Sequence, residues 1–586
     1  MNPSTAFGMV VTDELVRFGL REAVIAPGSR SAPLAMALFD RASADGPAGL
    51  RLHVRIDERS AAFLALGLAK ASRRPVALVC TSGTAAAHFH AAIIEADEAG
   101  VPLVVLTADR PPELRGTGAN QTIDQLKLYG GAVRWFCEAG VPEKRPGMAA
   151  YWRSLAGHAW AMASGAAGSF PGPVHVNVPL REPLVPGAAD AADAAGGEGG
   201  TGAAPWPEPL DGRPGGSPWT AFPRPGAAGP VRVEWAERGV VVCGDGDYAP
   251  GPLLGLAEAA GWPVLAEPSS NARRGPNALS AYGYLLDSPA FVAGHRPDVV
   301  VSAGRPGLSR GQQAFLRGAP GPVPPRHVVL AQGPGRWADP ARTATEVTAG
   351  IGLSGGPGPG RGSAWLAGWQ RADAAARRAA DAILDADEAL TEPRLARDLA
   401  AALPAGALLW AGSSLPVRDL DQQMSPRAGL RVLASRGTSG IDGLVSSAIG
   451  AALAHQAAGG GPAVALLGDL AFLHDAAGLM LGPSEPRPDL CLVVVNNGGG
   501  GIFSTLEQAA FPDSFERLFG TPHGTDLGLL ARAAGLPHVL LDKAAGLADA
   551  LRGDGVRVVE VRTDRTAGAE LRERLRHACG PAVGSA

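Results

Sequence analysis

The sequence of 586 residues lacks several features that would each assign it to a particular class of protein. It has no basic excess, since 52 Lys and Arg stand against 56 Asp and Glu, so we expect no nucleic-acid surface. It has no mostly apolar, uncharged run of about 18 residues, so we expect no membrane span. Residues 1–14 show no basic segment followed by an apolar core, so we expect no signal peptide.

Cysteine is also scarce. The 5 cysteines are an odd number without a short repeated spacing, and Cys80, Cys243 and Cys491 lie in or beside apolar, strand-like runs. Reduced, buried thiols are typical of proteins from the cytosol, where disulfides are rare. The sequence therefore predicts a cytoplasmic protein.

Strand-like and helical segments alternate along most of the chain, a pattern that predicts parallel sheets covered by helices. We predict the α/β class, with three consecutive α/β domains and mostly parallel sheets. The expected parts are an N-terminal domain (1–185), a Gly-, Ala- and Pro-rich linker (186–230), a middle domain (231–362) and a C-terminal domain (363–586).

Individual elements can be predicted within these domains. The predicted strands include 23–26, 76–80, 101–106, 174–178, 240–243, 263–266, 299–302 and 327–330. The predicted helices include 60–72, 84–98 and an exposed, charged one over 364–389. In the linker, Trp206, Trp219 and Phe222 are candidates to dock onto a domain surface.

Two apolar runs in the last third of the chain end in side chains that carry oxygen. One run leads into Gly468-Asp469-Leu470, and the other leads into Asn496-Asn497. Because the ends of parallel strands lie side by side, we expect Asp469 and Asn497 to face one point. Such oxygens suit magnesium, which keeps a diphosphate as another ligand. The pattern resembles the thiamin-diphosphate signature, in which Gly-Asp-Gly precedes Asn-Asn at a similar distance.

The metal interpretation depends on the two segments together, because singly Asp469 is explained as a helix cap and the Asn pair as a turn. The glycines 498–501 favour it, since glycine lets the backbone approach a ligand closely. Leu470 stands where most families have glycine. Gly244-Asp245-Gly246 matches the tripeptide better, but no Asn pair follows it, and we interpret it as a turn after a middle-domain strand.

Glu58 is the candidate acid of the first domain. Asp57 can cap the following helix, and Glu58 would then merely complement the helix dipole. A thiamin-diphosphate enzyme, however, needs a carboxyl group hydrogen-bonded to N1′ of the cofactor's pyrimidine ring. Given the metal motif, we predict this catalytic role for Glu58.

Four arginines follow strand-like runs in turns rich in small or polar residues: Arg30, Arg110, Arg418 and Arg436. The carboxyl edges of α/β sheets bind ligands, and arginine pairs with carboxylates in bidentate fashion. Any one of these arginines is explained equally well by a structural ion pair. Together they predict substrates with several carboxylates.

Longer segments make the resemblance more specific. The segments are 26–34, 57–63, 81–85, 106–114, 118–121, 439–443 and 501–504. They are similar to the 2-succinyl-5-enolpyruvyl-6-hydroxy-3-cyclohexene-1-carboxylate synthases, the menaquinone-pathway family called MenD. The resemblance covers the first and third regions nearly end to end and is weaker across the middle.

The resemblance implies a transferase that uses thiamin diphosphate and Mg²⁺. It decarboxylates 2-oxoglutarate and adds the resulting enamine in 1,4 fashion to isochorismate, giving a product with three carboxylates. Similar oxygen ligands serve Mn²⁺, so the choice of ion stays open. The alternative is another thiamin-diphosphate-dependent 2-oxo acid decarboxylase or carboligase, such as a pyruvate-using one. The presence of Glu58 and Asp469 disfavours a non-catalytic relative.

The resemblance also implies roles for single positions. Glu58 matches the activating glutamate, and the implied metal ligands are Asp469, Asn497 and the carbonyl of Gly499. The implied cofactor-binding residues are Glu58, Ile441, Gly468, Asp469, Leu470, Asn497 and Ile502. The implied substrate-site residues are Ser29, Arg30, Arg110, Gln121, Arg310, Ser414, Arg418, Arg436, Phe503 and Leu506.

Assembly follows from the same resemblance. In this superfamily the first domain of one subunit meets the third domain of a partner around each cofactor. Glu58 and Asp469 belong to these two domains. A homodimer or a homotetramer, with sites at the subunit interface, is therefore implied.

Overall fold

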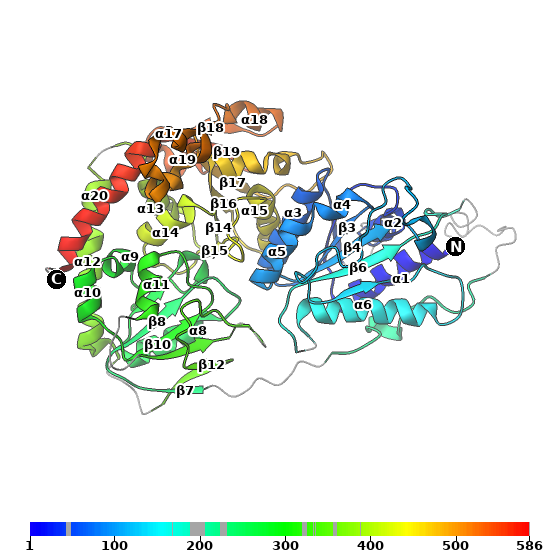
Figure 1. Cartoon of the computed structure of the whole chain (residues 1–586), viewed down its shortest axis with the longest axis horizontal. Coiled ribbons are helices and arrows are strands. Elements are labelled where there is room, and N and C mark those ends of the chain that lie inside the picture. The colour runs from blue at the N-terminus through cyan, green and yellow to red at the C-terminus, as the bar shows by residue number, and fades with distance from the viewer. Residues whose placement is uncertain are drawn as a thin grey trace. The chain divides into compact units, whose positions relative to one another are not determined.

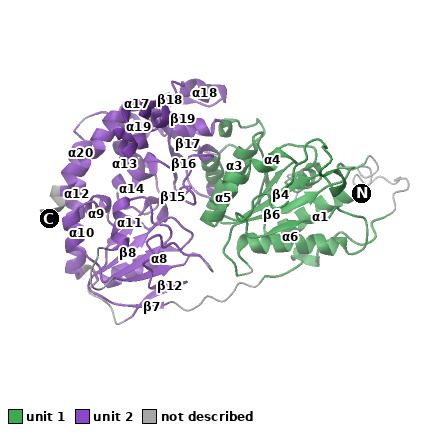
Figure 2. Ribbon diagram, viewed as in Figure 1, with its two compact units in different colours: residues 1–225, 446–454, 477–487 green, residues 226–445, 455–476, 488–586 purple. Residues whose placement is uncertain are grey.

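The computed structural model describes residues 1–42, 49–166, 168–187, 205–222, 231–318, 325–331, 333, 336–354, 360–386 and 388–584. The chain divides into two units (Figure 2). The first comprises 1–225, 446–454 and 477–487, and the second comprises 226–445, 455–476 and 488–586. All pairs of named strands in the described chain are parallel, as predicted for the fold class.

The first unit is built on a six-stranded sheet in the order β2-β1-β3-β4-β6-β5. Figure 1 labels three of its strands, β3, β4 and β6. Its strands are β1 (Glu22–Ile25), β2 (Arg51–Val54), β3 (Val76–Cys80), β4 (Leu103–Asp109), β5 (Phe136–Glu138) and β6 (Pro173–Pro179). Its helices include α1 (Pro3–Phe18), α2 (Ala32–Ala42), α3 (Glu58–Ser72), α4 (Thr84–Ala87), α5 (His90–Ala99) and α6 (Met148–Ser164). The inner strands are buried throughout, as expected of a parallel sheet covered on both faces.

The second unit begins with a five-stranded sheet in the order β12-β11-β10-β8-β9. Its strands are β8 (Gly239–Cys243), β9 (Val264–Ala266), β10 (Val299–Ala303), β11 (Arg326–Leu330) and β12 (Glu346–Thr348). The accompanying helices are α8 (Pro250–Ala260), α9 (Tyr282–Leu286), α10 (Pro289–Gly294) and α11 (Arg310–Arg317). A separate two-stranded ribbon joins β7 (Val231–Glu234) to β13 (Ile351–Ser354).

A second six-stranded sheet, in the order β15-β14-β16-β17-β19-β18, completes this unit. Its strands are β14 (Leu408–Ala411), β15 (Arg431–Leu433), β16 (Ala463–Gly468), β17 (Leu490–Asn496), β18 (His538–Leu540) and β19 (Val556–Arg562). The larger helices here are α12 (Ala364–Leu384), α13 (Glu392–Ala402), α14 (Leu415–Gln423) and α20 (Arg565–Gly584). Shorter or shared helices are α15 (Leu444–Ala457), α16 (Asp469–His474), α17 (Pro512–Phe515), α18 (Leu527–Ala533) and α19 (Leu547–Ala550). Within the sheet Gly468 pairs with Val495, so β16 and β17 end side by side.

Two helix predictions were wrong in detail. The helix expected over 84–98 is interrupted between α4 and α5, because the N–H of Phe89 bonds to the carbonyl of Ala86, three residues back instead of four. The helix expected over 364–389 ends at Leu384 and is not simply exposed. Apolar side chains recur along it at helical spacing, and Trp369 and Ala376 are fully buried.

The described part of the linker docks onto the first unit, as predicted. The ring of Trp206 lies 6.1 Å from that of Trp152, and the ring of Phe222 lies 5.9 Å from that of Phe18. The backbone N–H of Trp219 donates to a carboxylate of the same unit. Residues 188–204 and 223–230 of the predicted linker lie outside the described residues.

The cysteines are unpaired, as the sequence predicts. Four of the five are buried. Among the described residues, the helices are too short or too polar to cross a membrane.

A buried histidine makes the stability of the first unit depend on pH. His175 of β6 is fully buried, its Nε2 lies 2.7 Å from Oγ1 of Thr107, and burial lowers its pKa from 6.5 to about 3. Below pH 6.5 the unfolded chain therefore binds a proton that the folded chain does not. We therefore expect the free energy of unfolding to decrease as the pH is lowered below 6.5. The slope that this residue contributes approaches about 1.4 kcal/mol per pH unit. Urea titrations from pH 7 to pH 5 would show a shallower dependence for His175→Gln, and an equal dependence would contradict the assignment.

Candidate active site

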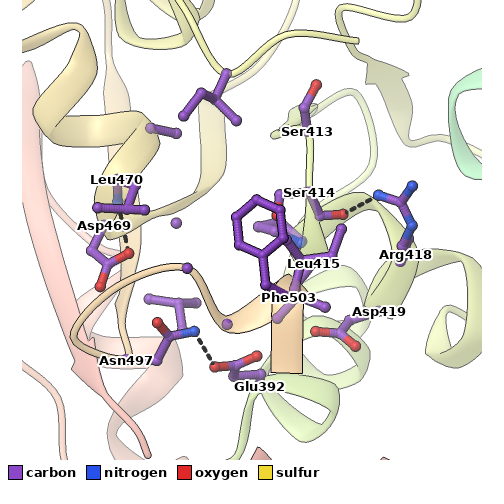
Figure 3. A pocket seen from close by; sticks show the side chains of 18 of the residues that line it. Glu392, Ser413, Ser414, Leu415, Arg418, Asp419, Asp469, Leu470, Asn497 and Phe503 are labelled. Carbon is purple, nitrogen blue, oxygen red and sulfur yellow. Dashed lines mark hydrogen bonds between the residues drawn. The ribbon is translucent and has the colours of Figure 1, made fainter. Parts of the chain in front are cut away.

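A cavity of about 380 Å³ lies in the second unit, at the carboxyl ends of β14, β16 and β17 (Figure 3). Segments that follow these strands supply most of its wall, with Glu392, Ser439 and Ile441 from elsewhere in the unit. Parallel strands bring residues that are distant in sequence to one edge of a sheet, where α/β folds bind ligands. All of the residues that line it belong to the second unit.

Asp469 stands at the centre of this edge. It directly follows β16, begins α16 and is 2% exposed. Its Oδ1 accepts a hydrogen bond from the N–H of Leu470 (2.7 Å), and its Oδ2 accepts one from the N–H of Gly499 (2.8 Å). Burial raises the pKa of this carboxyl, although these donors and His523 act in the opposite direction. A cation at the carboxylate would also favour its ionised form.

Asn497 follows β17 and presents a free oxygen. Its Nδ2 donates to Oε1 of Glu392 (2.8 Å), which fixes the orientation of the amide. Its Oδ1 is buried and has no hydrogen-bond partner among the described residues. A buried acceptor without a partner is unfavourable, so this oxygen indicates a place for a ligand such as a cation.

Gly499 has a backbone that only glycine tolerates here. Its φ is +146°, and a Cβ atom would lie 2.0 Å from the carbonyl oxygen of Gly520. Its own carbonyl accepts a bond from the N–H of Gly501 (2.9 Å) and keeps a second lone pair.

The three predicted ligands therefore offer a carboxylate, an amide oxygen and a backbone carbonyl, a set of hard oxygen donors that fits Mg²⁺. No group of three His, Cys, Asp or Glu suited to a metal occurs in the described part of the chain. That finding does not bear on this set, because only Asp469 is of those types.

The rest of the cavity combines apolar and polar walls. The predicted residues that line it beside Asp469, Asn497 and Gly499 are Ser414, Arg418, Ile441, Gly468, Leu470, Ile502, Phe503 and Leu506. Nη1 of Arg418 donates to the carbonyl of Ser414 (2.8 Å). The backbone of Ser414 has a φ of +75°, which is unusual for a serine. Burial and the neighbouring charge of Arg436 lower the pKa of Arg418.

The structure does not gather every predicted residue of the second unit in this cavity. Arg436 does not line it, although its charge acts on Arg418. Arg310 does not line it either, and begins α11 with an exposed side chain.

The predicted residues of the first unit form their own arrangement. Glu58 begins α3, and the side chain of Asp57 caps this helix by accepting from the N–H of Ser60 (2.9 Å), as the sequence predicts. Arg30 is buried and donates to the carbonyl of Leu180 (3.0 Å) and to Oε1 of Glu182 (3.4 Å).

Arg110 lies near Arg30. It donates to the hydroxyl of Ser82, and burial together with the charge of Arg30 lowers its pKa. Ser29 and Gln121 are exposed, and Gln121 has a φ of +52°. Two cations held this close favour an anionic partner.

Sequence reasoning missed two residues that contact the predicted metal ligands. Glu392 accepts a hydrogen bond from the side-chain amide of Asn497, and Nε2 of His523 lies 3.3 Å from Oδ2 of Asp469. In the sequence Glu392 looks like an ordinary acidic residue at a helix start, and His523 is a lone histidine in a loop. Neither carries a local pattern that could have revealed its role.

Two family models and several named relatives match this chain. Residues 6–128 match the family model described as the thiamine pyrophosphate enzyme, N-terminal TPP binding domain, and residues 418–561 match its C-terminal TPP binding domain. A relative from Thermobifida fusca, named 2-succinyl-5-enolpyruvyl-6-hydroxy-3-cyclohexene-1-carboxylate synthase, is 61% identical over 100% of both chains.

Relatives with the same name occur in Saccharopolyspora erythraea, at 50% identity over 98% of both chains, and in Kineococcus radiotolerans, at 44% identity over 100% of both chains. The chain therefore belongs to the 2-succinyl-5-enolpyruvyl-6-hydroxy-3-cyclohexene-1-carboxylate synthase family of thiamine pyrophosphate enzymes.

Proposed function

We propose that this chain is a thiamin-diphosphate-dependent synthase that joins 2-oxoglutarate, with loss of carbon dioxide, to isochorismate in menaquinone biosynthesis. Relatives that are 61% and 50% identical over nearly the whole of both chains carry the name of the synthase for this reaction, which supports the proposal. The structural observation that carries the proposal is the cavity at the strand ends, which is lined by buried Asp469 and by Asn497, whose amide oxygen has no hydrogen-bond partner in the described part of the chain.

In this proposal Asp469, the Oδ1 of Asn497 and the carbonyl of Gly499 hold Mg²⁺ or Mn²⁺, and the ion holds the diphosphate of the cofactor. The apolar residues Ile441 and Ile502 support the body of the cofactor. When bound, thiamin diphosphate supplies the electron sink for breaking and making carbon–carbon bonds.

The remaining roles belong to groups that hold protons or carboxylates. Glu58 keeps a proton at its carboxyl group for the cofactor's pyrimidine ring. Arg418 and Arg436 provide positive charge beside the cavity, and Arg30 and Arg110 provide it in the first unit. Arginine side chains bind carboxylates in bidentate fashion, and the two substrates carry several carboxylates.

We further propose that the working enzyme is a homodimer or a homotetramer with sites at the subunit interface. Membership of the thiamine pyrophosphate enzyme family supports this, because in that superfamily the first domain of one subunit meets the third domain of a partner around each cofactor. Five unpaired cysteines support a cytoplasmic location.

An assay with purified protein tests the reaction. Carbon dioxide release should require 2-oxoglutarate, thiamin diphosphate and a divalent metal, and the expected tricarboxylate should form only when isochorismate is also present. Removal of the metal with a chelator should stop turnover, and adding it back should restore it. Release of carbon dioxide from pyruvate and not from 2-oxoglutarate would overturn the proposal and favour a pyruvate-using enzyme.

A further inference from the structure

We propose that Glu392 is a positioning residue that fixes the amide of Asn497 with its oxygen toward the cation, and that Arg572 holds Glu392 in place for this purpose. The inference rests on the proposed metal site. It concerns a buried chain of contacts that runs from Asn497 through Glu392, which also lines the cavity, to Arg572 of the C-terminal helix α20.

The carboxylate of Glu392 is committed on both oxygens. It begins α13 and is 4% exposed. Its Oε1 accepts from Nδ2 of Asn497 (2.8 Å) and from Oγ1 of Thr563 (3.0 Å), and its Oε2 accepts from Nη2 of Arg572 (2.5 Å). An ionised carboxylate only accepts hydrogen bonds, so the neighbouring amide must turn its NH₂ group toward it.

Arg572 fixes the position of that carboxylate. Its guanidinium lies between Glu392 and Asp419, with Nη2 2.6 Å from Oδ2 and Nε 3.0 Å from Oδ1 of Asp419. Burial acts to lower the pKa of Arg572, but the two carboxylates outweigh it and raise the pKa. The Arg572 guanidinium therefore stays charged. Because a buried charge without its partners is strongly destabilising, Arg572 holds the carboxylates of Glu392 and Asp419 in place.

Asparagine alone cannot choose which atom faces a metal. Its amide oxygen and nitrogen have almost the same shape, so a turn of the amide exchanges them at little steric cost. An NH₂ group facing a cation is repelled, whereas the oxygen binds it. The acceptor behind Asn497 thus decides whether the residue is a ligand.

Replacement of Glu392 by glutamine tests this directly. In Glu392→Gln the remaining oxygen should turn to Arg572, and the new NH₂ group should then face Asn497. Two NH₂ groups cannot bond to one another, so the Asn497 amide should turn over and present nitrogen to the ion. We expect the apparent Mg²⁺ affinity at fixed thiamin diphosphate to fall by about 10- to 100-fold, the usual effect of losing an outer-shell partner.

A double variant separates positioning from general damage. In Glu392→Gln with Asn497→Asp, the glutamine NH₂ can donate to an aspartate, and both atoms that can face the ion are oxygens. We expect it to bind Mg²⁺ more tightly than Glu392→Gln alone. Asn497→Asp alone should bind Mg²⁺ poorly, because two carboxylates then meet at this contact.

Thr563→Val is the matched control. It removes a different donor from the same Oε1 of Glu392 and leaves the contact with Asn497 in place. We expect its Mg²⁺ affinity to stay within about threefold of the parent, the change of roughly 0.6 kcal/mol that a peripheral hydrogen bond contributes.

The measurement is the rise in melting temperature that Mg²⁺ produces in the full-length protein at fixed thiamin diphosphate, which needs no turnover. Tight Mg²⁺ binding by Glu392→Gln, or a double variant no better than Glu392→Gln, would overturn the positioning role. If the parent protein itself showed no Mg²⁺-dependent rise, the proposed metal site would fail instead, and the two failures are distinguishable.

Discussion

Glu58→Gln should lower turnover by about 10²- to 10⁴-fold, the range that a positioned acid or base contributes to a proton transfer. The change keeps the size of the side chain and its place at the first position of α3, but removes the group that can share a proton with the cofactor. Affinity for thiamin diphosphate should remain largely intact, because the metal ligands lie elsewhere. The measurements are steady-state turnover of 2-oxoglutarate with isochorismate, and the cofactor-induced rise in melting temperature.

Asp57→Asn is the control for this experiment. It removes a carboxylate from the adjacent residue, but asparagine caps a helix about as well as aspartate, so α3 should keep its N-terminus. We expect turnover within a few-fold of the parent. If Glu58→Gln were as active as Asp57→Asn, the proton-sharing role of Glu58 would be wrong.

Much of the fold could be predicted because apolar runs of strand length report directly on a buried parallel sheet. The prediction of β3 at residues 76–80 was confirmed, and strands β8 and β10 differ from their predictions by a residue. The helix errors have a physical source. Charge and alanine content alone do not reveal that one face of α12, which includes Trp369, is buried. The spacing of the apolar residues along the helix could have shown it.

The candidate site divides in the same way. Asp469 and Asn497 could be found because strand ends of a parallel sheet must meet at one edge, and the structure places them on one cavity. Glu392 could not, since its contact with Asn497 joins residues far apart in sequence through side-chain orientation alone. Arg572 was equally hidden, as one arginine in a basic C-terminal helix.

Replacement of the central carboxylate should have the largest effect on metal binding. In Asp469→Asn one oxygen is lost, so the side chain can no longer accept both from Leu470 and from Gly499, and the charge that faces the ion disappears. We expect the apparent Mg²⁺ affinity to fall by more than about 100-fold, beyond the 10- to 100-fold typical of residues that only orient a ligand. Turnover at ordinary Mg²⁺ concentrations should be lost with it, and the thermal shift on adding Mg²⁺ and thiamin diphosphate should disappear.

The chain supplies its own control for this change. Asp245 lies in Gly244-Asp245-Gly246, which matches Gly-Asp-Gly better, and is likewise buried, two residues after the end of the parallel strand β8. The carbonyl of Asp245 accepts from the N–H of Arg305 (2.8 Å), and this backbone bond survives Asp245→Asn. Because no asparagine pair follows it and it does not line the cavity, Asp245→Asn should leave Mg²⁺ affinity within about threefold of the parent. If Asp245→Asn abolished the Mg²⁺-dependent shift and Asp469→Asn kept it, the tripeptide alone would mark the site and the pairing of two strand ends would not.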